Sequence, residues 1–220
     1  MQIIRLLDIC EGSVISVIGC GGKTSLIGLL AEKLHEKKVL ISTTTKMYPM
    51  ITGAQCLGRL NPENGKLEAL PDHELMGLIP NYNVTLLEAD GSRGLFCKGW
   101  LANEPVVPPY CTHTAGVVTM AAFGKPATET YIHRLPEFLA LTGLKAGETI
   151  TTEALETMTC SPNGMFKNSA GRKYLIINQV EDDETAGIAL EFLQTIKANY
   201  PNRFERLLYG SVRLDAWQEA

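Results

Sequence analysis

Apolar residues along this chain gather in short runs that are separated by glycine, proline, asparagine and aspartate. Such runs predict strands, and their continuous apolar character is typical of a parallel sheet that is covered on both faces. Six runs have this character: residues 14–18, 39–43, 84–89, 115–120, 174–178 and 206–209.

Helical spacing of apolar residues appears between these runs. Residues 24–37 carry an apolar face between the first two predicted strands, which predicts a βαβ unit with a right-handed crossover. Residues 183–199 repeat this pattern between the last two strands. Shorter helical patterns are found at 72–79, 133–141 and 152–159. The alternation predicts an α/β fold with a mostly parallel sheet flanked by helices.

The stretch of residues 53–82 breaks this alternation. Asn64 and Gly65 form the Asn-Gly pair that favours a tight β-turn, and Leu60 and Leu67 flank the turn. We therefore predict a hairpin inside an insertion between two core strands.

Residues 97–113 form a second excursion from the sheet. Three prolines exclude a helix after Trp100 and predict an extended loop over the surface. They are Pro105, Pro108 and Pro109. The order of the motifs along the chain favours a single α/β domain over residues 1–220, with both stretches as excursions.

Composition limits the classes of ligand. The 220 residues are 45% hydrophobic and 20% charged, which supports a real core and excludes a disordered chain. The 20 Lys and Arg against 24 Asp and Glu give a net charge of −4, which excludes general binding to nucleic acid or anionic membranes. No apolar run approaches the roughly 20 residues of a membrane span. Asp8 also interrupts the N-terminal apolar stretch, so a cytoplasmic location is expected.

A glycine-rich turn joins the first predicted strand to the first helix, and it reads Gly19-Cys20-Gly21-Gly22-Lys23-Thr24-Ser25. The N–H groups of such a turn, at the positive end of a helix dipole, bind a di- or triphosphate. Lys23 is expected beside the β- and γ-phosphates, and Thr24 is expected to give its hydroxyl to Mg²⁺. Val17 stands where the full motif has its first glycine, so the turn is a shortened version that resembles the loop of the Mur-type amide ligases. It predicts a P-loop NTPase-like fold that binds ATP or GTP.

The six cysteines are scattered without metal-ligand spacing, which predicts reduced and mostly buried thiols. Cys20 lies inside the glycine-rich turn. Its thiol either fits the tight turn as a small residue or acts as a redox or metal-sensing group.

Polar residues follow the second and third predicted strands. Thr45 and Lys46 lie on the edge where the phosphate loop opens and are expected to contact phosphate or its metal. Glu88 and Asp90 are two residues apart, which places them on one face of a strand and resembles a Walker-B element. Arg93 is expected to stabilise charge on a transferring phosphoryl group. The alternative role of the two carboxylates is to cap a turn. The predicted catalytic residues are Lys23, Glu88, Asp90 and Arg93, and the predicted metal ligands are Thr24, Glu88 and Asp90.

Two further polar groups are candidates for ligand contacts. Asn178 opens a stretch that resembles the NKxD element with which GTPases read guanine, although Gln179 replaces its lysine and Glu181 its aspartate. A strand end followed by a helix cap is the alternative, so the choice between ATP and GTP stays open. His133 and Arg134 lie at an expected helix start and form either a second anion site or a solvated helix end.

Taken in order, these stretches resemble the YqeC family, the selenium-dependent hydroxylase accessory proteins. The matching stretches are VIGCGGKTSLIGLLAEKL, VLISTTTKMY, LLEADGSRG, NEPVVP, FGKP, IHRLPEF and YLIINQVED. The resemblance implies an α/β nucleotide-binding fold and a part in the maturation of selenium-dependent molybdenum hydroxylases or their cofactor.

The leading hypothesis is a Mg²⁺-dependent nucleoside triphosphatase that drives a step in this maturation. One alternative is a non-catalytic carrier or scaffold, switched by nucleotide, that delivers cofactor or selenium to the hydroxylase. Another is an ATP-dependent kinase or ligase that acts on a pterin-type substrate. The expected partners are the nucleotide and the molybdenum hydroxylase or its maturation proteins. The sequence leaves the oligomeric state open, and a homodimer across the phosphate loop is one candidate.

Overall fold

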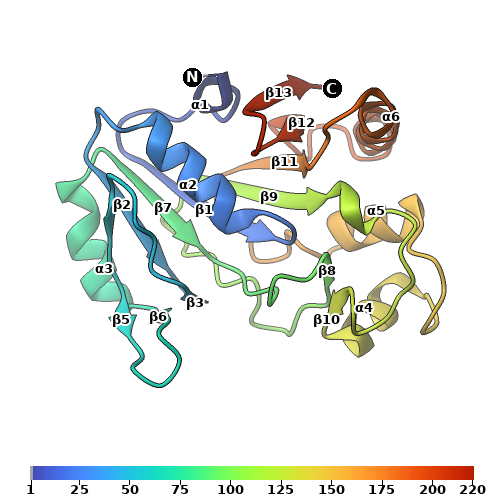
Figure 1. The fold of residues 1–220 in the computed structure, drawn as a ribbon, viewed down its shortest axis with the longest axis horizontal. Coiled ribbons are helices and arrows are strands. Elements are labelled where there is room, and N and C mark those ends of the chain that lie inside the picture. Colours follow the sequence, from blue (N-terminus) through green and yellow to red (C-terminus); the bar gives the residue numbers. More distant parts are fainter. Residues whose placement is uncertain (1) are drawn as a thin grey trace.

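A computed structural model describes residues 2–220 and shows a central sheet between two layers of helices (Figure 1). Within these residues the sheet has eight strands in the order β13-β12-β11-β9-β1-β7-β2-β4, parallel throughout except for the β12–β13 pair. The strands are β1 (Ser13–Gly19), β2 (Val39–Thr43), β4 (Gln55–Cys56), β7 (Val84–Glu88), β9 (His113–Thr119), β11 (Arg172–Asn178), β12 (Arg206–Ser211) and β13 (Ala216–Glu219). The predicted mixed α/β fold with a mostly parallel sheet is confirmed.

All six predicted strands are present, and their ends differ from the predicted ones by no more than two residues. Every residue of β1, β2, β7 and β9 is buried. This burial explains why the strands are continuous apolar runs, since helices cover the sheet on both faces.

The helices divide between the two faces of the sheet. On β11, Tyr174 and Ile176 pack in one core with residues of α1 (Gln2–Leu6) and α2 (Lys23–Lys33), while Leu175 and Ile177 pack in the opposite core. That opposite side of the sheet is covered by α3 (Asp72–Leu78), α5 (Thr152–Cys160) and α6 (Asp183–Asn199). Helix α4 (Leu135–Thr142) packs against α5.

The order of the strands places an acidic residue beside the glycine-rich loop. Helix α2 connects β1 to β2 in the chain, as predicted, and the two strands run in the same direction. In the sheet, however, β7 lies between them. Val17 of β1 pairs in register with Glu88 at the end of β7. The carboxyl ends of these strands therefore gather the loop, Thr43 and Glu88 at one edge of the sheet.

Two strands of the first excursion, with one strand that precedes it, form a small three-stranded sheet below the main one in Figure 1, whereas β4 of the same excursion is an edge strand of the main sheet. The predicted hairpin is confirmed, because Leu60 of β5 (Arg59–Leu60) pairs with Leu67 of β6 (Leu67–Glu68) in antiparallel register. Along its other edge, β6 pairs with β3 (Lys46–Met47), which follows β2 in the chain.

The second excursion has no helix between residues 99 and 112, as its prolines predict. It is not simply a surface loop, however, because Trp100 and Lys98 are buried. Lys98 belongs to β8 (Cys97–Lys98), which pairs with β10 (Ile132–His133). His133 therefore lies in a strand rather than at a helix start, and α4 begins two residues later. The predicted helix start is therefore wrong for His133, because the β8 pairing extends the chain there, whereas Arg134 is the N-cap residue of α4.

Some elements escaped the sequence pattern. Helix α1 and the edge strand β13 have too few apolar positions to show a period, and the one-turn 3-10 helices η1 (Ile79–Asn81) and η2 (Met120–Ala122) are shorter still. Helix α2 ends at Lys33, before the predicted end, because residues 34–37 form a turn into β2. No helix within residues 2–220 is both long and apolar enough to cross a membrane.

The edge strand β13 closes the core through one side chain. Trp217 is 2% exposed and packs in the same core as α1 and α2. We expect Trp217→Ala to lower the free energy of unfolding by about 3–5 kcal/mol, as is usual for a large aromatic removed from a core. Urea unfolding followed by circular dichroism measures the change. Leu214→Ala is the control, because Leu214 is 50% exposed and should change stability by less than about 0.5 kcal/mol. Equal effects of the two variants would contradict the packing of β13.

Candidate functional site

The turn between β1 and α2 is shaped by three glycines with positive φ. Gly19, Gly21 and Gly22 have φ of 90°, 77° and 123°. A Cβ at Gly19 would lie 2.3 Å from the carbonyl oxygen of Val117, and one at Gly22 would lie 2.2 Å from the side-chain nitrogen of Asn178. Glycine is therefore required both by the backbone conformation and by the close approach of β9 and β11.

This turn leaves donors free at the start of a helix. Gly22 caps α2 without any side-chain hydrogen bond. Within residues 2–220 the N–H groups of Gly21 through Ser25 donate to no acceptor. Free N–H groups at a helix N-terminus, together with the helix dipole, favour an anion such as a phosphate.

The predicted lysine and threonine of this turn face β7 and the loop after it. The Nζ of Lys23, which is buried, donates to the Oγ of Ser92 at 3.0 Å. The hydroxyl of Thr24 donates to the Oε2 of Glu88 at 2.6 Å. Thr24 and Glu88 thus present hard oxygen donors side by side, and these suit Mg²⁺.

Asp90 does not share this position with Glu88. Its Oδ2 accepts hydrogen bonds from the Gly19 N–H at 3.1 Å and from the Trp100 indole at 2.8 Å, and its Oδ1 pairs with the Nζ of Lys98 at 2.5 Å. The side chains of Asp90 and Lys98 are fully buried. The predicted convergence of both carboxylates on one metal is not found, because β7 ends at Glu88 and the alternation of faces ends with it.

Lys98 connects this buried contact to a second carboxylate. It also donates to the Gly91 carbonyl at 2.7 Å and lies 3.2 Å from the Oε2 of Glu104. Glu104 in turn pairs with Arg134. Burial lowers the pKa of Lys98, and the Asp90 carboxylate opposes this shift. Sequence reasoning missed Lys98 because a single lysine in a short irregular stretch carries no pattern.

A cleft of about 960 Å³ opens in front of the glycine-rich turn, and we call it the main cleft. It brings together all four basic residues that were predicted around a phosphate site, Lys23, Lys46, Arg93 and Arg134, with Thr24, Ser25, Thr45, Glu88 and His133. Arg93 and Arg134 have φ of 53° and 58°, an uncommon backbone conformation for residues with a Cβ. Lys46 forms an ion pair with Glu68 of β6 at 2.8 Å.

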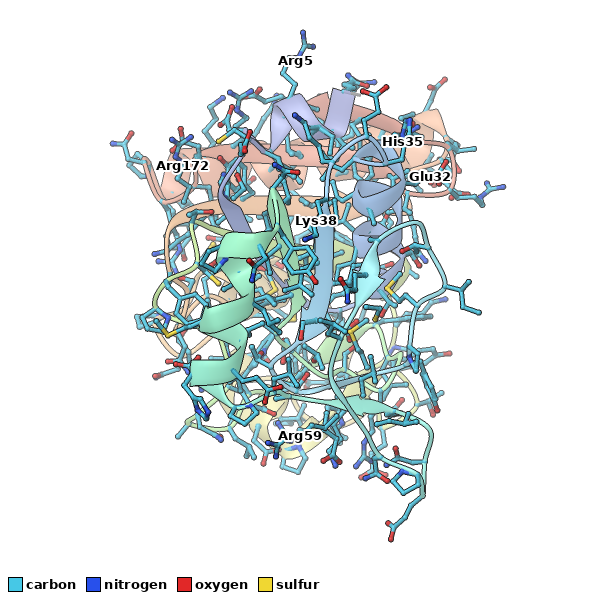
Figure 2. All side chains as sticks on the ribbon, turned by 90° about the vertical axis from the view of Figure 1, so that its left-hand side faces the viewer. Arg5, Glu32, His35, Lys38, Arg59 and Arg172 are labelled. Atoms are coloured by element: carbon cyan, nitrogen blue, oxygen red, sulfur yellow. The ribbon has the colours of Figure 1, made fainter. Side chains whose placement is uncertain are left out.

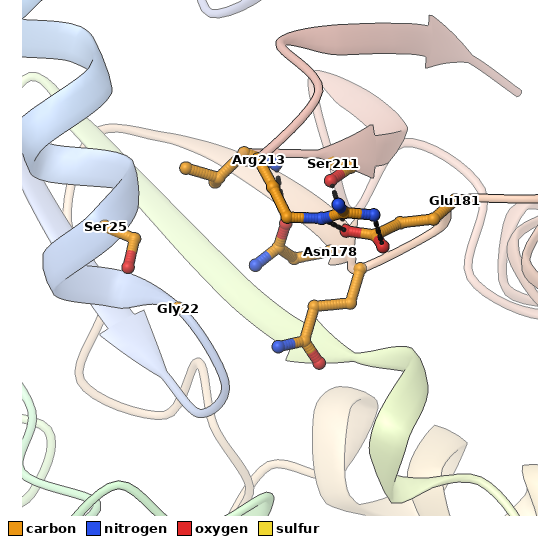
Figure 3. A pocket seen from close by; sticks show the side chains of 8 residues that line it. Gly22, Ser25, Asn178, Glu181, Ser211 and Arg213 are labelled. Atoms are coloured by element: carbon orange, nitrogen blue, oxygen red, sulfur yellow. Dashed lines mark hydrogen bonds and ion pairs between the residues drawn. The ribbon is translucent and has the colours of Figure 1, made fainter.

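A second hollow of about 570 Å³ lies on the other side of the turn, beyond Gly22 and Ser25, and we call it the side pocket (Figure 3). Asn178 lines it, donating to the Gly21 carbonyl at 3.0 Å and accepting from the Val212 N–H at 3.0 Å. Glu181 also lines it, but its carboxylate is held by Ser211 and Arg213. Figure 3 shows the Arg213 guanidinium lying along this carboxylate.

Asp182 accepts a hydrogen bond from the Thr185 N–H at 2.8 Å and caps α6 in a reciprocal capping box. It therefore forms the helix cap that was the predicted alternative for the stretch after Asn178. Because Glu181 is also engaged, and both polar ends of the Asn178 side chain bond to backbone groups, these contacts do not distinguish ATP from GTP.

The thiol of the cysteine in the turn is buried. Cys20 is buried, and burial raises its pKa to about 12. A thiol with a raised pKa is a poor nucleophile and metal ligand at neutral pH, so the geometry favours its interpretation as a small residue in a tight turn. All six cysteines are free thiols in the structure, and four of them are buried.

The donors around the turn suit one kind of metal site. Within residues 2–220 no group of three His, Cys, Asp or Glu side chains forms a metal cage. Mg²⁺ in phosphate sites needs only one or two protein oxygen ligands, with water and phosphate oxygens completing its shell. The pair of Thr24 and Glu88 meets that smaller requirement.

Comparison with known proteins decides the family. A model of the YqeC protein family matches residues 15–136, more than half of the chain. The chain belongs to the YqeC family. A curated relative, an uncharacterized protein YqeC of Escherichia coli strain K12, is 31% identical over an alignment that covers 84% of this chain and 83% of the relative. No solved structure matches the chain. The resemblance inferred from the sequence motifs is therefore confirmed, although the name of the YqeC relative states no activity.

The range matched by the YqeC family model covers the lining of the main cleft but only part of the lining of the side pocket. It includes the glycine-rich turn, Glu88, Asp90 and both arginines of the main cleft. It ends before Asn178, Glu181 and Arg213 of the side pocket. The family model thus spans the main cleft and the buried contacts of Asp90.

The charges of the main cleft are expected to act on His133. Burial lowers its pKa, and the positive charges of Lys98 and Arg93 lower it further. We expect the imidazole to titrate below its ordinary value of about 6.5 in a ¹H–¹³C NMR titration. Since the unfolded chain binds the proton first, this group lowers the free energy of unfolding as the pH falls below about 6.5.

Arg93→Ala should move this midpoint upward, because it removes one of the two cations. Lys37→Ala, at an exposed site outside the cleft, is the control. A midpoint above about 6.5, or one that Arg93→Ala leaves unchanged, would contradict the placement of Arg93 beside His133.

Proposed function

We propose that this protein binds a purine nucleoside triphosphate with Mg²⁺ in the main cleft and hydrolyses it. The observation that carries the proposal is the row of free N–H groups at Gly21 through Ser25, with Lys23 beside it and the Thr24–Glu88 pair facing it. The strand that bears Glu88 is the direct neighbour of the strand that bears the turn. This combination supports a P-loop NTPase-like architecture in which phosphate and metal ligands come from adjacent strands.

The roles of the individual residues follow from their contacts. The turn amides and Lys23 hold the β- and γ-phosphates, and Lys23 exchanges its hydrogen bond with Ser92 for phosphate oxygens. Thr24 and Glu88 hold Mg²⁺, which when bound neutralises charge on the phosphates. Glu88 also orients the attacking water, while Arg93 or Lys46 offsets charge that develops in the transition state.

Asp90 has a different role from the one its spacing predicted. Its carboxylate binds Gly19, Trp100 and Lys98, so we assign it to positioning the turn rather than to holding the metal. The nucleoside extends toward the side pocket, where Asn178 and the Glu181–Arg213 pair meet the base. ATP and GTP are both candidate ligands of this pocket.

The family resemblance gives the biological setting of the proposal. We place the activity in the maturation of selenium-dependent molybdenum hydroxylases or their cofactor. A hydroxylase, or a protein that matures it, is the expected partner.

The first test removes the phosphate lysine. Lys23→Ala should weaken binding of Mg²⁺ with a non-hydrolysable ATP or GTP analogue at least about 30-fold, since truncating one member of a desolvated charged contact costs roughly 2 kcal/mol or more. Isothermal titration calorimetry measures the affinity. Lys37→Ala removes the same charge at an exposed site and should bind like the wild type. Undiminished binding by Lys23→Ala would exclude the phosphate-loop assignment.

The second test separates binding from turnover. Glu88→Gln keeps the size of the side chain but removes its charge, and should slow phosphate release at least about 100-fold while the analogue still binds. A coupled phosphate assay with purified protein gives the rate. Unchanged release by the variant would reject the role of Glu88. Wild-type protein that binds nucleotide but releases no phosphate would favour the nucleotide-switched carrier instead.

A further inference from the structure

The main cleft is larger than one triphosphate requires. Its volume of about 960 Å³ lies at the upper end of the range for whole small-molecule ligands. In the proposed function the nucleoside points away from it toward the side pocket. The part of the main cleft that lies across from Glu88 is therefore available to another molecule.

That far part is bounded by three parts of the fold that are distant in the chain. The small sheet of the first excursion contributes Lys46, Tyr48 and Lys66. The loop after β7 contributes Arg93, and β10 with the residue after it contributes His133 and Arg134.

The basic residues of this wall differ in whether a carboxylate pairs with them. Lys46 is paired with Glu68, and Arg134 is paired with Glu104. Arg93 is exposed and forms no ion pair within residues 2–220. Lys66 likewise meets no carboxylate among the described side chains, and its Nζ lies 4.8 Å from the centre of the Tyr48 ring. Two unbalanced cations thus face one hollow.

From this arrangement we infer that the main cleft holds a second, anionic small molecule, such as a phosphorylated or carboxylated organic compound, between Arg93 and Lys66. Arg93 offers a planar fork that matches a phosphate or carboxylate, and Lys66 supplies a point charge from the opposite side. This site deepens the proposed function and rests on it, because the bound nucleotide occupies the turn and leaves the far wall to the second ligand.

The sequence pattern left His133 and Arg134 as either a second anion site or a solvated helix end. In the structure both line the same wall, but Glu104 already balances Arg134, and burial lowers the pKa of His133. They are therefore secondary contacts, whereas Arg93 and Lys66 carry the charge. Lys66 could not be recognised in the sequence, because a lysine after an Asn-Gly turn is typical of a solvated hairpin.

The test uses inorganic phosphate as the probe. Protein saturated with Mg²⁺ and a non-hydrolysable ATP or GTP analogue is titrated with phosphate, and the ¹H–¹³C signal of His133 reports binding in the cleft. Lys66→Gln and Arg93→Gln should each weaken phosphate binding about tenfold, which corresponds to the loss of one charge-assisted hydrogen bond. Lys66→Gln should keep its affinity for the analogue.

Arg59→Gln is the matched control. Arg59 lies on the same hairpin and is exposed, but it does not line the cleft (Figure 2). Phosphate binding that Arg59→Gln weakens as much as Lys66→Gln would overturn the site in favour of a general charge effect. A saturated protein that does not bind phosphate would overturn the inference alone. Failure of the analogue itself to bind would overturn the proposed function, and the second site with it.

Discussion

The buried carboxylate of Asp90 is the contact on which the geometry of the main cleft depends. Its oxygens join the first residue of the glycine-rich turn to Trp100 and Lys98 of the second excursion. Removing a carboxylate and an ammonium from water costs several kcal/mol for each ion, and the cost is offset only when both are fully hydrogen-bonded. Here the Gly91 carbonyl and Glu104 complete the partners of Lys98. The turn, the end of β7 and the wall near Arg134 are therefore held as one unit.

The second constraint is the order of the sheet. Because β7 lies between β1 and β2, Glu88 ends beside the turn, and the segment that follows β2 leads directly into the small sheet that carries Lys66. The glycine-rich turn, the acidic residue and the basic wall thus come from separate stretches of the chain but meet at the carboxyl ends of parallel strands. This is the edge where ligands bind in open α/β sheets.

Much of this arrangement was predictable, because its signals are local. The six buried strands are continuous apolar runs, and the turn combines three positive-φ glycines with a lysine and a threonine at a helix start. The separate contacts of Glu88 and Asp90 were not predictable, since the alternation of faces assumes a strand that continues and β7 ends at Glu88. Lys66 and Lys98 were missed because their roles depend on tertiary contacts between distant segments. The edge strand β13 was missed because it buries a single side chain.

The central claim is that the turn and Glu88 form a nucleotide site, and a crystal structure with Mg²⁺ and a non-hydrolysable triphosphate analogue tests it most directly. The account predicts phosphate oxygens on the N–H groups of Gly21 through Ser25, the metal beside Thr24 and Glu88, and the base in the side pocket near Asn178. An analogue bound away from the turn, with the hydrogen bonds of Lys23 to Ser92 and of Thr24 to Glu88 intact, would contradict it.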